Sequence, residues 1–97
     1  VVNVALVHVG FGNVVALNRL LAIVAPESAP VRRLMRHAAE RELTIDATCG
    51  HKTKAVLVLD TGAIVLSALS PETIANRVRN PRDARAEREP RSETEDL

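Results

Sequence analysis

The chain has 97 residues, of which 46% are hydrophobic, 1% aromatic and 26% charged, and its formal net charge is +1. This length allows one small soluble domain, and because small domains bury only about 60% of the surface that the unfolded chain exposes, self-association is expected. Phe11 is the only aromatic residue and Cys49 the only cysteine, which excludes recognition of single-stranded RNA by base stacking and an intramolecular disulfide, and favours a reducing cytoplasm.

Apolar residues dominate the first quarter of the chain. Residues 2–9 form a run that is too short for a membrane span and lacks a basic leader, so it predicts a buried strand. Gly10-Phe11-Gly12-Asn13 follows and predicts a turn that needs positive φ angles. The next apolar run, 14–24, is interrupted by Asn18-Arg19, a polar pair that predicts a break between two short strands.

Two helices are expected. Ser28 is suited to cap a helix over residues 29–41, because a serine hydroxyl can accept a hydrogen bond from an amide of the first turn. Pro30 is tolerated in that first turn, because amides there have no intrahelical partner. The helix has an apolar face, expected to pack on a sheet, formed by Val31, Leu34, Met35, Ala38 and Ala39. Its opposite face carries Arg32, Arg33, Arg36, His37 and Glu40. Ser70-Pro71-Glu72 predicts the start of a second helix that extends to about Arg79.

The residues between the two helices predict three strands. A strand over 43–48 is followed by a polar loop over 49–54, and strands over 55–60 and 63–69 form a hairpin around Thr61-Gly62. The whole pattern predicts a small α+β domain with a mostly antiparallel sheet and two helices.

The composition divides the chain near residue 80. Residues 1–80 contain nine basic and six acidic residues, whereas residues 81–97 contain four basic and six acidic residues and almost no apolar ones. The first segment is expected to fold as one domain. The second has too little apolar surface to offset the chain entropy lost on folding, and it predicts a disordered charged tail.

Signatures of enzymes and cofactor sites are incomplete. Gly10-x-Gly12 lacks the third glycine of a dinucleotide-binding motif, and Cys49-x-His51 supplies two of the roughly four ligands that a closed zinc site needs. Asp46 lies in an expected strand, where a structural carboxylate is more common than a catalytic base. We therefore expect no enzyme activity, no metal and no cofactor.

Basic residues give a stronger indication. Lys52 and Lys54 project from the predicted loop and Arg19 breaks an apolar run, and exposed positive charge of this kind attracts phosphate groups. The charge alone leaves two functions open, a DNA-binding protein and an oligomeric structural scaffold whose loops contact other subunits. The arginines at 32, 33 and 36 are a second candidate surface, for which a solvated helix face or an ion-pair partner between subunits is an equally good interpretation.

Five short motifs then stand in the order and spacing of one family. They are Gly10-Phe11-Gly12-Asn13, Asn18-Arg19, Pro26-Glu27-Ser28-Ala29-Pro30, Ile45-Asp46-Ala47-Thr48 and Pro71-Glu72-Thr73. Over residues 3–79 the chain resembles the RemA family of bacterial regulators, also known as extracellular matrix regulatory proteins. The resemblance implies a cytoplasmic, nucleoid-associated transcription regulator of the biofilm-matrix type, which assembles into a homo-oligomeric ring of octameric form and bends double-stranded DNA along repeated basic loops.

The resemblance also implies which residues contact DNA. The family's basic loop reads Gly-Arg-Arg-Thr-Arg and corresponds here to residues 50–54, so that His51, Lys52 and Lys54 stand at its basic positions; Arg19 matches a further DNA-binding arginine. Lysine lacks the planar fork with which arginine grips a phosphate, so each contact is expected to be weaker than in relatives. Because histidine gains a proton at mildly acidic pH, DNA binding is expected to tighten there.

Overall fold

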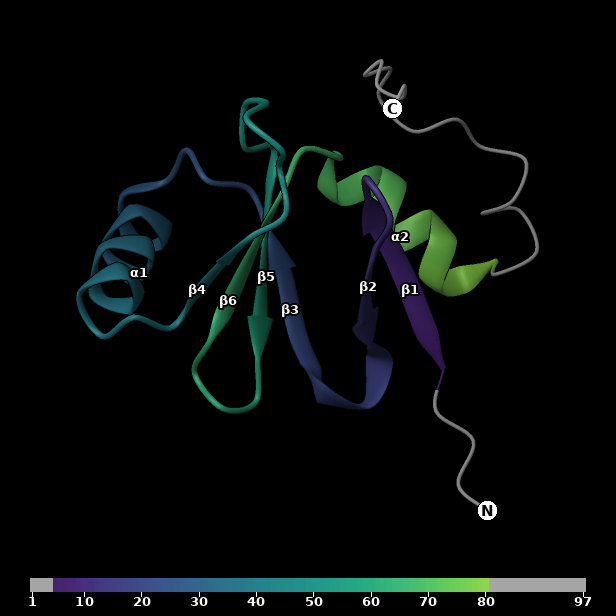
Figure 1. Ribbon diagram of the computed structural model, residues 1–97, viewed down its shortest axis with the longest axis horizontal. Coiled ribbons are helices and arrows are strands. Elements are labelled where there is room, and N and C mark those ends of the chain that lie inside the picture. Colours follow the sequence, from purple (N-terminus) through teal and green to yellow (C-terminus); the bar gives the residue numbers. More distant parts are fainter. Residues whose placement is uncertain (1–4, 81–97) are drawn as a thin grey trace.

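The computed structural model describes residues 5–80 (Figure 1). Over this range the elements follow in the order β1 (Leu6–Gly10), β2 (Asn13–Ala16), the 3-10 helix η1 (Leu17–Arg19), β3 (Leu20–Val24), α1 (Ala29–Glu40), β4 (Thr44–Asp46), β5 (Ala55–Leu59), β6 (Ile64–Ser67) and α2 (Pro71–Arg79). The expected tail over 81–97, and the first residues of the strand expected over 2–9, lie outside the described residues. Neither helix in residues 5–80 has the length and apolar character needed to span a membrane.

Local signals in the sequence placed the helices and turns. The hydroxyl of Ser28 accepts a hydrogen bond from the Val31 amide at 3.3 Å, and that of Ser70 accepts one from the Thr73 amide at 3.1 Å, so both expected N-caps are confirmed. The break at Asn18-Arg19 is also confirmed, as η1. The expected hairpin is formed by β5 and β6. The α+β class with two helices is therefore confirmed.

The strands form two sheets. A four-stranded sheet has the order β3-β5-β6-β4, and β1 and β2 form a separate antiparallel pair, which we call the ribbon. Within the larger sheet β4 pairs with β6 in parallel. This parallel pair arises because α1 carries the chain back along the sheet after β3, so that β4 starts at the same end as β3 and runs in the same direction. The expectation of one sheet is corrected to two, of which the larger is mixed.

The larger sheet is covered on both faces. Alternate residues of β5 point to opposite sides, so that Val56 packs with α1 whereas Leu57 packs with the ribbon and α2. The expected apolar face of α1 does pack on the sheet, through Ala38 and the partly buried Val31, Leu34 and Met35. Ala39, which was expected on that face, is exposed. Figure 1 shows α1 on one side of the sheet and α2 with the ribbon on the other.

Two buried side chains attach the ribbon to the rest of the molecule. Ser67, at the end of β6, donates a hydrogen bond from its hydroxyl to the Val9 carbonyl at 2.8 Å and accepts one from the Leu69 amide at 3.0 Å. Arg77 of α2 donates from Nη1 to the His8 carbonyl at 3.3 Å. These side chains donate hydrogen bonds to carbonyl groups of β1 that would otherwise need donors from another strand. They also fix the end of β1 that leads into the β1–β2 turn.

The larger sheet has two ends with different contents. At one, the loop end, lie the β1–β2 turn, the segment between β4 and β5, and the starts of both helices; at the other, the hairpin end, lie η1 and the β5–β6 turn (Figure 1). This arrangement follows from the antiparallel pairing of β5 with β3 and β6, which brings the start of β5 beside the ends of its neighbours. The candidate site residues are divided between these two ends.

Candidate functional site

The segment between β4 and β5, residues 47–54, is the basic loop. It follows Asp46, the last residue of β4, whose Oδ1 accepts hydrogen bonds from the Thr48 hydroxyl at 2.6 Å and the Thr48 amide at 2.9 Å. These two bonds, the hydroxyl first, lower the pKa of the Asp46 carboxyl below its ordinary value. The structural role expected for Asp46 is confirmed, and because the carboxylate draws the chain into a turn, β4 ends here and is shorter than the expected strand.

The middle of the basic loop is a tight turn, and its end is tied to β6. Cys49 and Gly50 both have left-handed backbone angles, with φ of 51° and 85°, and the His51 amide donates to the Thr48 carbonyl at 3.0 Å. The Lys54 amide donates to the Ser67 carbonyl at 2.8 Å, where the chain enters β5. The loop is thus held at both ends by hydrogen bonds while its middle projects from the sheet.

The three basic side chains of this loop are exposed. His51, Lys52 and Lys54 all face solvent, and the sequence from 47 to 54 contains no acidic residue. Within residues 5–80 neither lysine forms an ion pair. Cations that are exposed and not neutralised by a neighbouring carboxylate are available to an anionic ligand, and the backbone of DNA presents phosphates at close, regular spacing.

An aromatic contact joins the basic loop to the ribbon. The ring of Phe11, in the β1–β2 turn, stacks on the imidazole of His51 with 5.0 Å between ring centroids and 16° between ring planes. Sequence reasoning missed this contact. The available signal was the placement of the chain's only aromatic residue in a glycine-rich turn, where no strand or helix buries it.

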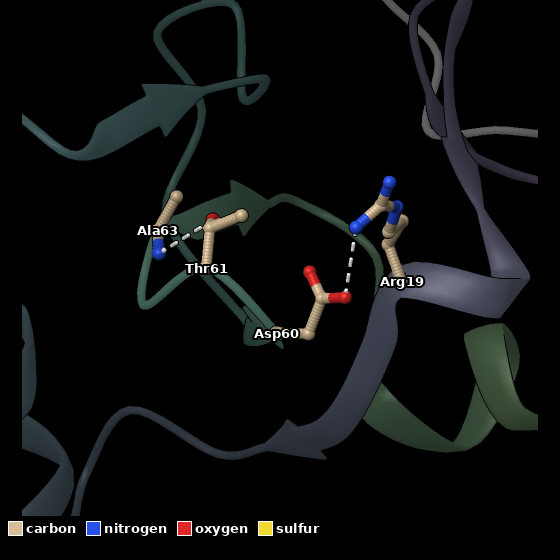
Figure 2. Close-up of polar contacts among 4 residues, drawn as sticks. All are labelled: Arg19, Asp60, Thr61 and Ala63. Atoms are coloured by element: carbon tan, nitrogen blue, oxygen red, sulfur yellow. Dashed lines mark hydrogen bonds and ion pairs between the residues drawn. The ribbon is translucent and has the colours of Figure 1, made fainter.

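Arg19 lies at the hairpin end, away from the basic loop. Its Nη1 forms an ion pair with Oδ2 of Asp60 at 3.1 Å (Figure 2). The Arg19 carbonyl also accepts a hydrogen bond from the Asp60 amide at 2.9 Å. In the adjacent turn, the Thr61 hydroxyl accepts a bond from the Ala63 amide at 3.3 Å. Lys54 and Asp60 lie at opposite ends of β5, and because a strand rises about 3.3 Å per residue, their backbones are about 20 Å apart. Arg19, which pairs with Asp60, therefore lies at the far end of β5 from Lys54. One protomer brings together His51, Lys52 and Lys54 but not Arg19.

The arginines of α1 form a further exposed group. Arg32 donates from Nε and Nη2 to the Glu27 carbonyl, at 3.1 and 2.7 Å, and so stabilises the start of the helix. Arg33 and Arg36 are exposed on the face that points away from the sheet. Arg32 thus has a structural contact, whereas Arg33 and Arg36 present charge to solvent.

An open apolar hollow of about 250 Å³ lies where the ribbon faces the larger sheet. Val14 and Ile45 line it although they are 44% and 54% exposed, and Asn13 and Arg19 are its polar lining residues. The rest of the lining is aliphatic. Exposed aliphatic side chains of this kind are typical of protein contact surfaces.

Comparison with known proteins agrees with the resemblance. The chain is 58% identical over 78 residues to a protein of Synechococcus elongatus, an alignment that covers 80% of this chain and 90% of the relative. It is 50% identical over 93 residues to a protein of Alkaliphilus metalliredigens, covering 96% and 99%, and 45% identical over 85 residues to one of Halalkalibacterium halodurans, covering 88% and 98%. The names of all three place them in the class of regulatory proteins.

Residues 6–78 match the profile of the RemA-like family, described as extracellular matrix regulatory protein A-like. The match covers most of the chain, and this protein belongs to the RemA-like family.

Proposed function

We propose that this protein is a bacterial transcription regulator that binds double-stranded DNA as a ring-shaped homo-oligomer. Its basic loops contact the phosphate backbone through Lys52, Lys54 and His51. The observation that carries the proposal is the basic loop itself, which presents three exposed basic side chains, contains no acidic residue between positions 47 and 54, and is fixed at both ends of its backbone. Family membership supports a regulatory role.

Assembly is part of the proposal because one loop is a weak binding site. Two lysines and a histidine engage two or three phosphates, which gives little affinity at physiological salt. In a symmetric oligomer the same loop recurs at regular intervals, and after the first loop binds, the others meet DNA at a high effective concentration. The exposed apolar side chains Val14, Leu21 and Ile45 supply surface that subunit contacts would cover.

Arg19 takes part in this proposal through a neighbouring subunit. In a head-to-tail contact the hairpin end of one copy faces the loop end of the next, so Arg19 of one subunit and the lysines of another can lie along one DNA path. Its ion pair with Asp60 is exposed, and exposed pairs contribute only about 0.2–1 kcal/mol. A phosphate can therefore replace the carboxylate at low cost.

The expected recognition depends more on the DNA backbone than on bases. Lysine contacts a phosphate as a point charge and lacks the bidentate geometry with which arginine reads guanine. Specificity would then come from the ease with which a sequence bends along the ring. Regulation of extracellular matrix genes and a cytoplasmic, nucleoid-associated location complete the proposal.

The test is duplex-DNA affinity measured against salt concentration, for the wild type and the double variant Lys52→Ala/Lys54→Ala. Each phosphate contact contributes about −0.9 to the slope of log K against log salt, so losing two contacts should reduce the slope by about 1.8 for every loop engaged. Arg33→Ala/Arg36→Ala is the matched control, since it removes two exposed charges from α1. Oligomer size is determined for all three proteins in the same buffers.

We expect the lysine variant to keep its oligomer and lose both affinity and slope, while the control keeps most of each. An equal loss in the two variants would mean that only overall charge matters, and the assignment of the basic loop would be wrong.

A structural scaffold is the second candidate function, favoured by the exposed apolar side chains around the hollow. A scaffold would bind DNA with little salt dependence, and substitution of the lysines would break the oligomer into smaller species. The same experiment therefore separates the two functions.

A further inference from the structure

We infer that Phe11 is a positioning residue for the basic loop: its ring holds His51, and thereby Lys52, in the arrangement that meets the DNA backbone. The inference rests on the proposed function and adds a residue to it that lies outside the loop and carries no charge. Phe11 belongs to the β1–β2 turn, and the 5.0 Å stack on His51 is its contact with the loop end of the larger sheet.

The β1–β2 turn is built to project this ring. Gly10, Phe11 and Gly12 all have left-handed backbone angles, with φ of 109°, 55° and 81°, a conformation that glycine adopts readily and phenylalanine does not. Asn13 closes the turn by donating from Nδ2 to the carbonyls of Gly10 at 3.0 Å and Phe11 at 3.5 Å. A bulky residue in a disfavoured conformation indicates that the surrounding structure holds it there.

The β1–β2 turn is also fixed to the larger sheet. The Ser67 hydroxyl binds the Val9 carbonyl immediately before the turn, and the Ser67 carbonyl accepts the Lys54 amide at the end of the basic loop. Ser67 therefore ties the ribbon and the basic loop to the same point of β6. The ring of Phe11 adds a second contact between the ribbon and the basic loop by stacking on His51.

The stack has a direct bearing on binding. The part of the basic loop between its two fixed ends has to be ordered when it binds a phosphate, and a contact that orders it beforehand removes part of that cost. An aromatic pair typically favours the stacked state by about two- to tenfold beyond the effect of area burial. A phenyl ring carries no charge and forms no ion pair with a phosphate, so its loss should weaken DNA binding without changing the number of phosphates neutralised.

The experiment compares Phe11→Ala, Phe11→Leu and Phe11→Tyr with the wild type. Duplex-DNA affinity is measured against salt, with oligomer size determined in parallel. His51→Ala and the double variant Phe11→Ala/His51→Ala complete a double-mutant cycle. Leu6→Ala is the matched control, because it shortens another exposed apolar side chain of the ribbon at the end away from the loop. The NMR signals of the His51 ring are recorded without DNA, since a stacked phenyl ring shifts them.

We expect Phe11→Ala and Phe11→Leu to weaken binding two- to tenfold per engaged loop with an unchanged salt slope and oligomer size. Phe11→Tyr should bind as the wild type does, and Phe11→Ala should have no further effect in the His51→Ala background. The His51 ring signals should move in Phe11→Leu and stay in Leu6→Ala.

Several results would overturn the inference. Unchanged affinity in Phe11→Leu, an equal loss in the presence and absence of His51, or His51 ring signals that ignore the substitution would each do so. If the wild type binds DNA through its lysines and Phe11→Leu has no effect, only this inference fails. If the wild type does not bind DNA, the proposed function fails as well.

Discussion

Replacing Ser67 by alanine tests whether side-chain hydrogen bonds hold the ribbon on the larger sheet. Ser67 is fully buried, and its hydroxyl satisfies two buried groups at once, the Val9 carbonyl and the Leu69 amide. Alanine keeps the β-carbon, as a methyl group, and removes only the hydroxyl, so packing changes little. Both backbone groups would then be left without a partner in a site that water does not reach.

The size of the effect follows from these two groups. A buried donor or acceptor that loses its partner costs about 1–3 kcal/mol, so Ser67→Ala should lower the free energy of unfolding by about 3 kcal/mol. For a domain of this size 1 kcal/mol shifts Tm by about 4–8 °C, which predicts a fall of roughly 12–24 °C.

The assay is thermal and urea unfolding followed by circular dichroism, at one protomer concentration for all proteins because assembly contributes to stability. Ser28→Ala is the control. It is the same chemical change at an exposed N-cap, where the expected cost is about 1 kcal/mol. If Ser67→Ala costs no more than Ser28→Ala, the reasoning about the buried bonds is refuted.

Two further predictions concern pH. The first rests on the lowered pKa of Asp46: its ionised form stabilises the fold above the ordinary pKa of 3.8, and this stability is lost as pH falls through the folded pKa. The free energy of unfolding, measured in urea, should therefore be higher for the wild type than for Asp46→Asn at pH 7, and the difference should be smaller at pH 3. An equal difference at the two pH values would contradict this prediction. The second follows from the sequence: a protonated imidazole at position 51 would add positive charge to the basic loop, so duplex-DNA affinity should be higher at pH 6 than at pH 8 in the wild type and not in His51→Ala. An equal rise in both proteins would assign the effect to another group.

Local structure was well predicted because local chemistry determines it. Ser28 and Ser70 cap the helices through bonds that span three residues, and the turn at Thr61-Gly62 needs only its own sequence. The pairing of strands was less accessible. The parallel alignment of β4 with β6 and the separation of the ribbon depend on how distant segments pack, and the apolar pattern of each strand is the same for either arrangement.

In the candidate site, too, local features were predictable and contacts between distant segments were not. Exposure of Lys52 and Lys54 was predictable, because a short polar loop between two apolar strands projects into solvent. The partner of Arg19 was not predictable, because Asp60 follows β5 and is 41 residues away in the sequence. The stack of Phe11 on His51 likewise joins distant segments. The role of these residues in DNA binding stays a prediction.

The attachment of the ribbon has a consequence for motion. Ser67 and Arg77 hold its carbonyls through side chains, whereas β5 is enclosed by backbone ladders on both sides. Regions with fewer cooperative bonds open at lower free energy, so the amide hydrogens of the ribbon should exchange with solvent before those of β5. Opening would carry Phe11 away from His51, and a ligand that requires the ordered loop would slow this exchange. Exchange in the ribbon therefore reports, from outside the basic loop, whether that loop is engaged.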